Sequence, residues 1–186
     1  EFFRRVEAGE IRPDEPLTLR KEHRVGGSGV LKELSEGKVT MPLLDYATLM
    51  ITVSDNIATN ICIDLVGMGR INETLARLGL EKTRIARRMM DMEGLAAGKE
   101  NVSTPREMMR LMEGIYLKKL VEATACERTL EILRKPKEGL IEGVIRNAVP
   151  DDIPVANKSG WVEGATCDAG IVFLPKRPYA IAVLTK

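Results

Sequence analysis

The sequence predicts an α+β fold in which a mainly helical lobe, residues 1–150, is followed by an incomplete antiparallel sheet in residues 151–186. Through most of the first 150 residues, apolar side chains recur at every third or fourth position, which is the period of an amphipathic helix. After Pro150 the pattern changes to short runs rich in Val, Ile and Ala between turn-forming residues, as is typical of antiparallel strands. Those runs are residues 155–158, 169–174 and 179–184.

The amino-terminal segment begins with helical apolar spacing at Phe2, Phe3 and Val6. A short strand-like run, Leu17–Leu19, precedes the glycine-rich residues 26–29. Glycine frees the backbone and gives no side chain to pack, so we expect a flexible loop there.

Three amphipathic helices are expected between residues 40 and 79. The first is predicted to enter at Thr40 and Pro42, since proline in the first turn of a helix loses no hydrogen bond. The second has apolar side chains at four-residue intervals from Ile57 and Gly67 as its natural stop, and the third ends at Gly79.

Residues 83–103 have little periodicity and are predicted to form a long ordered, omega-like loop, and loops of this length usually have a function. Thr104, Pro105 and Glu107 have the spacing of a helix cap, so a helix with a buried apolar stripe should begin there. Two further helices are expected over residues 120–133 and 140–148.

The composition argues against several classes of function. The 186 residues are 44% hydrophobic and 30% charged with a net charge of +1, which gives no long-range field to attract nucleic acid and disfavours a helical DNA-binding protein. No apolar run reaches the roughly 18 residues that span a bilayer, so no membrane segment is expected. Three cysteines without C-x-x-C spacing and a single histidine predict no metal site, and no motif implies a cofactor.

Two short polar motifs carry the chemical argument. Ser54, Asp55 and Asn56 follow the apolar run 43–53, and Lys158-Ser159-Gly160 lies about a hundred residues later at the start of a strand-like run. Alone, Ser-Asp-Asn is a common helix-capping string, and Lys-Ser-Gly occurs in many turns. An acyl-transfer enzyme, however, needs a hydroxyl, a proton carrier, a cation for the substrate and a polar amide that orients it. The two motifs together supply several of these groups.

The motifs resemble the S-D-N and K-T-G elements of class A β-lactamases and penicillin-binding proteins. The likeness extends over residues 48–60, Asn157–Gly160 and Asp168–Val172, and over Asn101–Pro105, which resembles the exit of the family's omega loop. This resemblance implies a β-lactamase-like fold, a periplasmic or secreted location, and hydrolysis of β-lactam amide bonds through an acyl-serine intermediate.

The resemblance also implies a role for each motif residue. Ser54 would relay a proton toward the leaving nitrogen, Lys158 would supply positive potential, and Asn56 would bind the side-chain amide of the substrate. Asp55 would be internal scaffolding. The strand would contact the substrate through the Ser159 hydroxyl, which meets its carboxylate, through Gly160, and through the backbone N–H of Trp161 as an oxyanion donor.

The sequence departs from the family pattern in three places. The nucleophile of the S-x-x-K element is expected before residue 1, since Phe2–Val6 resembles the second half of its helix, and both ends look trimmed. The literal S-x-x-K string Ser35–Lys38 is interpreted as a loop because it contains Gly37. Met89 falls near the position of the glutamate that activates water for deacylation, which leaves Asp91 and Glu93 as the nearby carboxylates and predicts weak deacylation. Cys167 stands where many members have a guanidinium.

The sequence therefore predicts a β-lactamase-like serine hydrolase acting on a small molecule, a β-lactam or a peptidoglycan-like peptide, with no turnover by these 186 residues alone. The alternative is a non-catalytic or penicillin-binding-type module that recognises the same ligands. Exposed apolar edges at Phe2, Phe3 and the Tyr179 strand predict a homodimer.

Overall fold

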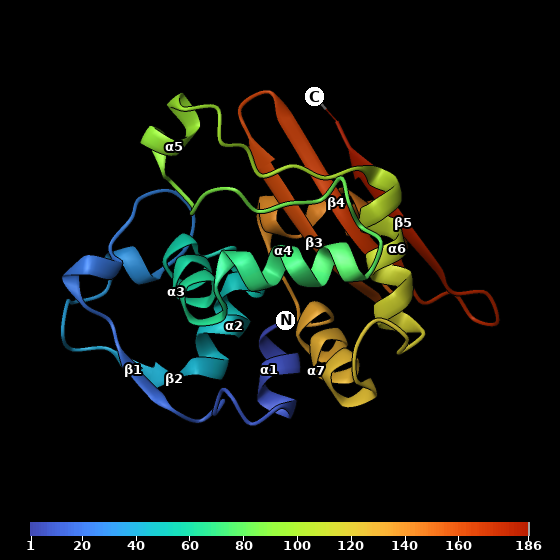
Figure 1. Cartoon of the computed structure of the whole chain (residues 1–186). Helices are drawn as coiled ribbons and strands as arrows, with labels where there is room; N and C mark the ends of the chain where they lie inside the picture. The colour runs from blue at the N-terminus through green and yellow to red at the C-terminus, as the bar shows by residue number, and fades with distance from the viewer. Residues whose placement is uncertain (186) are drawn as a thin grey trace. The chain divides into compact units, whose positions relative to one another are not determined.

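The computed structural model describes residues 1–185 and divides into two compact units, Glu1–Val102 and Ser103–Lys186. The order of helices and strands confirms the predicted α+β class (Figure 1). The predicted division at residue 150 reflects secondary-structure content and stays a prediction, since the packing groups the later helices with the strands.

Unit 1 is mainly helical and also contains a short antiparallel ribbon, β1 with β2. Its helices are α1 (Phe2–Glu7), α2 (Leu43–Thr52), α3 (Asn56–Val66), α4 (Met68–Arg77) and α5 (Met92–Ala96), its strands are β1 (Pro16–Thr18) and β2 (Thr40–Pro42), and its 3-10 turns are η1 (Lys21–His23) and η2 (Leu31–Glu33).

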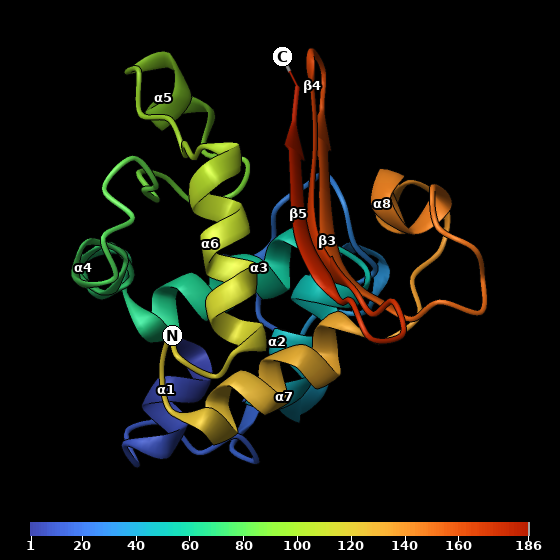
Figure 2. The ribbon, with the colours of Figure 1, turned by 90° about the vertical axis from the view of Figure 1, so that its right-hand side faces the viewer.

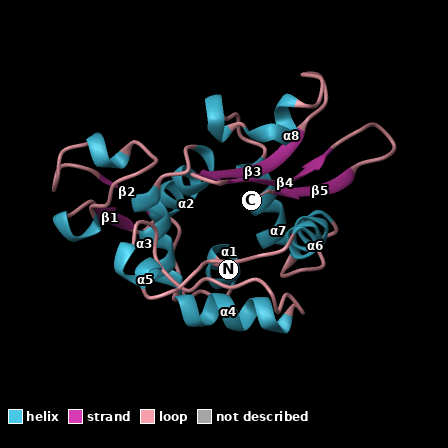
Figure 3. Ribbon diagram, turned by 90° about the horizontal axis from the view of Figure 1, so that it is seen from above, coloured by secondary structure: helices cyan, strands magenta, loops and turns pink. Residues whose placement is uncertain are grey.

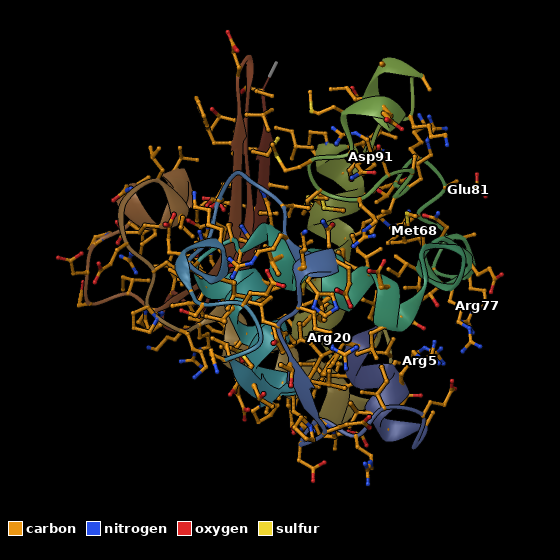
Figure 4. The ribbon with its side chains drawn as sticks, turned by 90° about the vertical axis from the view of Figure 1, so that its left-hand side faces the viewer. Arg5, Arg20, Met68, Arg77, Glu81 and Asp91 are labelled. Atoms are coloured by element: carbon orange, nitrogen blue, oxygen red, sulfur yellow. The ribbon has the colours of Figure 1, made fainter. Side chains whose placement is uncertain are left out.

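Helix α3 has a capping residue at its start, a glycine at its end and buried side chains along most of its length. The Asp55 carboxylate accepts a hydrogen bond from the Ala58 N–H and caps the first turn, and Gly67, at φ +88°, ends the helix. Ile57, Ile61 and Val66 are buried. Arg5 of α1 donates to the Val66 carbonyl over 2.9 Å and so joins α1 to the end of α3; Figure 4 labels this arginine.

Two predictions for unit 1 are wrong. Thr40 does not enter a helix: it lies in β2, where its hydroxyl hydrogen-bonds that of Thr18 over 2.8 Å, and α2 begins at Leu43. Phe2 and Phe3 are not an exposed edge either. They are 8% and 7% exposed and pack edge to face, so the homodimer prediction now depends on the Tyr179 strand alone.

Unit 2 is a three-stranded antiparallel sheet of order β3-β4-β5 with a helix on each face (Figure 2). Helix α6 contacts β4 and β5, and α8 contacts β3 and β4; Figure 3 shows the three strands side by side. The elements are α6 (Pro105–Tyr116), α7 (Ala123–Leu133), η3 (Gly139–Ile141), α8 (Gly143–Asn147), β3 (Val155–Val162), β4 (Ala165–Val172) and β5 (Tyr179–Leu184).

The start of α6 confirms the predicted cap, since the Thr104 hydroxyl accepts a hydrogen bond from the Glu107 N–H over 3.2 Å. Met112 and Ile115 are buried on the predicted apolar stripe. On the α8 face, Ile145, Val155 and Val172 form a small apolar core. The sheet is thereby held between two packed layers, as an α+β domain requires.

The helix predicted over residues 140–148 is instead divided into η3 and α8. Gly143, the first residue of α8, has a φ of +87°, which interrupts the helical backbone between η3 and α8. Only glycine fits there, because a Cβ would lie 2.3 Å from an oxygen of the buried Asp168 carboxylate. The strand predicted over 155–158 extends to Val162 and forms a hairpin with β4. Among residues 1–185, no helix has the length and apolar character that a bilayer crossing requires.

Candidate functional site

The Ser54-Asp55-Asn56 motif occupies the tight junction between α2 and α3 in unit 1. Ser54 has a φ of +50°, a left-handed conformation that is uncommon for a residue with a side chain and that is often found at functional sites. The motif is therefore held in a strained geometry by its surroundings.

Asp55 provides that restraint. Its carboxylate is fully buried and accepts three backbone hydrogen bonds, from Val30 at 2.7 Å, from Leu31 at 2.9 Å and from Ala58 at 3.0 Å. The side chain thus caps α3 and fastens the preceding loop to it, which agrees with the scaffolding role expected for this residue.

The glycine-rich loop at residues 26–29 is fastened to the motif, so it is more restrained than its glycine content predicts. The Asn56 amide donates to the Gly26 carbonyl over 3.1 Å, and the Asn56 N–H donates to the Ser28 carbonyl over 3.0 Å. A Cβ at Gly27 would lie 2.3 Å from the Asn56 amide nitrogen, and one at Gly29 2.2 Å from an Asp55 carboxylate oxygen. The loop therefore needs glycine at both positions.

Gly29→Ala should destabilise the chain by about 3 kcal/mol, because the new methyl group overlaps Asp55 and the residue, at φ +111°, would be strained. Gly26→Ala is the matched control: nothing lies within 4 Å of its added Cβ, and we expect a change below about 0.5 kcal/mol. Urea unfolding of both variants measures the difference, and equal effects would show that the loop does not pack against Asp55.

The omega-like loop of residues 83–103 is closed at its neck by two backbone hydrogen bonds between Arg84 and Val102. The side-chain amide oxygen (Oδ1) of Asn101 accepts from the N–H groups of Ala86 and Arg87 at 2.8 and 3.0 Å. These bonds support the prediction of an ordered loop, which contains the short helix α5.

Asn60 ties this loop to α3 and is a residue that sequence analysis missed. It is 1% exposed, donates to the Met89 carbonyl over 3.1 Å and accepts from the Met89 N–H over 2.7 Å. The available signal was an asparagine four residues after Asn56, next to the apolar residues Ile61 to Ile63 of the same helix, because a buried amide must find partners.

The two carboxylates beside Met89 are differently placed. Asp91 caps α5 and accepts from the Gly94 N–H over 2.8 Å; Figure 4 labels it on the loop. Glu93 is exposed within α5. Asp91 is therefore engaged in holding the local helix.

In unit 2, the Lys158-Ser159-Gly160 motif and Trp161 lie in β3, from its middle toward its carboxyl-terminal end. Among the described residues β3 pairs with β4 alone, with Gly160 opposite Cys167. Gly160 is exposed and Trp161 is 64% exposed. The end of the strand that carries the motif is thus the more open one, whereas Val155 to Asn157 are buried.

Burial lowers the pKa of Lys158 to about 8, with a further decrease from the charge of Lys137 and a partial offset from Asp168. Its ammonium group also donates to the Ser159 carbonyl. At neutral pH the Lys158 side chain is therefore mostly charged, and it loses its proton when the pH rises above about 8.

The Ser159 hydroxyl points to a neighbouring backbone, where it donates to the Ile141 carbonyl over 2.7 Å. A hydroxyl has one hydrogen to donate. Ser159 would therefore have to leave Ile141 to donate to a ligand carboxylate, and this would require a local rearrangement of η3 or of the serine.

A buried polar pair anchors β3 and β4 to α8. Asp168 is 1% exposed and accepts from the Ile145 N–H over 2.9 Å and from the Asn157 amide over 3.1 Å. Both residues lie in segments that resemble the family, but the resemblance did not predict that Asp168 and Asn157 pair with each other. Each unit thus holds one half of the predicted site: Ser54, Asp55 and Asn56 in unit 1, and Lys158 to Trp161 in unit 2.

Comparisons with known proteins give a consistent family. A family model described as "Beta-lactamase enzyme family" matches residues 1–186. The chain is similar to the crystal structure of a beta-lactamase from Sphaerobacter thermophilus, with a TM-score of 0.88 and 29% identity over 100% of this chain and 69% of that one. No curated protein matches the chain.

The chain is also similar to a penicillin-binding protein, PBP-A, with a TM-score of 0.84 and 28% identity over 98% of this chain and 66% of that one. The same values hold for a leucine-to-glutamate variant of PBP-A, solved as an acyl-enzyme complex with penicillin G. The chain thus spans about two thirds of the length of these structures.

Proposed function

This chain belongs to the beta-lactamase enzyme family, and from that premise we propose that residues of both motifs take part in recognising β-lactams or peptidoglycan-like peptides for acyl transfer to a serine. The observation that carries the proposal is the placement of Ser54 and Asn56, which the buried Asp55 fixes with three hydrogen bonds. Such preorganisation is what an acyl-transfer site requires of groups that act on a developing charge.

In the proposed site, Ser54 passes a proton to the leaving nitrogen and Asn56 orients the substrate amide. Lys158 provides the positive potential and Ser159 binds the substrate carboxylate. Backbone groups of Gly160 and Trp161 pair with the substrate as an added strand, with the Trp161 N–H stabilising the oxyanion.

We further propose that deacylation is slow, so that the function is of the penicillin-binding type rather than efficient hydrolysis. Support comes from the loop beside α3, where the residue held by Asn60 is Met89, Asp91 is used as a helix cap and Glu93 is exposed. The thioether of Met89 cannot take a proton from a water molecule, so it could not activate water for deacylation as a glutamate does.

The chain of 186 residues is expected to bind benzylpenicillin reversibly, to gain no mass and to hydrolyse no nitrocefin. Its S-x-x-K string lies in an exposed turn, where Gly37 has a φ of +67°. Calorimetry measures binding, intact mass spectrometry detects an adduct, and absorbance follows nitrocefin. Hydrolysis or a covalent adduct would show that a side chain among these 186 residues acts as the nucleophile, and failure to bind any β-lactam would contradict the proposed function itself.

A further inference from the structure

Unit 2 contains a cavity of about 310 Å³ between the end of α7, α8 and the first residues of β3. Four of its lining side chains are cations, Arg134, Lys135, Lys137 and Arg146, and one, Glu142, is an anion. The charge around the cavity is therefore strongly positive in a chain whose net charge is only +1.

None of these four cations forms an ion pair with a described residue, although one of them, Lys137, has an anionic side chain, Glu142, on the same cavity. Elsewhere Arg5 and Arg70 share Glu10, Arg88 pairs with Asp64, and Lys118 pairs with Glu127. Burial lowers the pKa of Lys137, and the charge of Asp168 offsets this only in part. Neighbouring cations repel one another, and a bound anion would reduce that repulsion.

The cations also retain hydrogen-bond donors that they do not use within the protein. The guanidinium of Arg146 donates to the carbonyls of Ile153, Val149 and Pro150, which engages three of its five N–H groups. The Lys137 ammonium donates to the Leu133 and Lys135 carbonyls and has a third N–H. The guanidinium of Arg134 lies over the Phe173 ring, with its central carbon 4.7 Å from the ring centroid. This contact is made by the guanidinium carbon and does not use the N–H groups as hydrogen-bond donors.

We propose that this cavity binds a small multivalent oxyanion, such as a phosphate or a compact polycarboxylate. The volume is that of a small-molecule site, and two arginines favour planar, charge-assisted contacts to oxyanions. Asn157 is buried and lines the same cavity. Its amide donates to the Asp168 carboxylate and to the Glu142 carbonyl, and these hydrogen bonds fix its position in the cavity wall.

A bound anion would also act on Lys158, the next residue after Asn157. The charge of Lys137 lowers the pKa of Lys158. An anion that screens Lys137 would reduce this repulsion and favour the charged form of Lys158. The cavity would thereby link the concentration of an anion to the charge of a proposed site residue.

The test is a calorimetric titration of inorganic phosphate into the 186-residue chain at low ionic strength, where screening is weak. We expect saturable binding, and Arg134→Gln with Lys135→Gln should weaken it about tenfold or more, since hydrogen bonds to charged groups are each worth at least that factor in affinity. Both positions are exposed, so the double variant should fold.

The matched control is Lys176→Gln with Arg177→Gln, which removes two exposed positive charges from the same unit. It should bind phosphate as the unchanged chain does. The proposal would be overturned by a lack of saturable binding, by equal weakening in both double variants, or by loss of binding in Ser159→Ala instead, which would locate the phosphate on the β3 motif. The Arg134 and Lys135 substitutions lie outside the two motifs, so weaker phosphate binding in that double variant leaves the proposal for β-lactam binding unaffected.

Discussion

Asp55→Ala is expected to lower the free energy of unfolding by about 4 kcal/mol, because the buried N–H groups of Leu31 and Ala58 and the part-buried N–H of Val30 would each lose a partner, and an unpaired buried donor costs about 1–3 kcal/mol. The loss of the α3 cap contributes to this sum. Urea or thermal unfolding of the purified variant measures it.

Asp91→Ala is the matched control for this substitution. Both aspartates cap a helix, but Asp91 accepts one hydrogen bond, is only half-buried, and caps the five-residue α5. We expect a loss of about 1 kcal/mol or less. If the two substitutions were equally mild, Asp55 would not be the restraint that fixes Ser54 and Asn56.

The elements that were predictable from sequence are those with local signals at both ends. Helix α3 has an aspartate cap and a terminal glycine, and α6 begins with threonine and proline. Local signals failed where a distant residue decides the backbone. The break at Gly143 depends on Asp168, which lies 25 residues later, and nothing near Gly143 predicts it.

The candidate site shows the same division. Its motif residues were recognisable because three polar side chains follow an apolar helix, and a lysine and a serine lie in a strand-like run. The partners that hold them were not, since the pairings of Asn60 with Met89 and of Asn157 with Asp168 join residues that are 29 and 11 positions apart. Burial of Ser159 against Ile141 is likewise a property of packing and not of sequence pattern.

The affinity of the chain for benzylpenicillin is expected to fall as the pH rises from 7 to 9.5. The pKa of Lys158 is about 8, and above it the ammonium that would attract the ligand carboxylate loses its proton. A single proton linkage gives a decrease of up to about tenfold per pH unit above that value. Calorimetric titrations at several pH values measure the slope.

The stability of the folded chain should change in the opposite direction over the same range. A lysine pKa lowered from 10.5 to about 8 means that the unfolded chain holds the proton more tightly, so the contribution of Lys158 to stability rises with pH between these values. Deprotonation of Lys158 does not destabilise the folded chain, so a loss of affinity over this pH range could not be attributed to unfolding caused by that deprotonation.

Lys158→Arg is the control for the pH dependence, because the guanidinium stays charged throughout the range. The variant should bind benzylpenicillin with an affinity that is almost independent of pH. A flat profile in the unchanged chain, or the same slope in both proteins, would assign the titration to another group.

The central claim, that residues of both motifs recognise the same ligand, is tested most directly by a calorimetric titration of benzylpenicillin into the chain and into Asn56→Ala and Lys158→Ala. The claim predicts a single binding event that each substitution weakens by about tenfold or more, as expected for loss of a hydrogen bond or a charge-assisted contact. Binding that depends on only one of the two residues, or on neither, would contradict the claim.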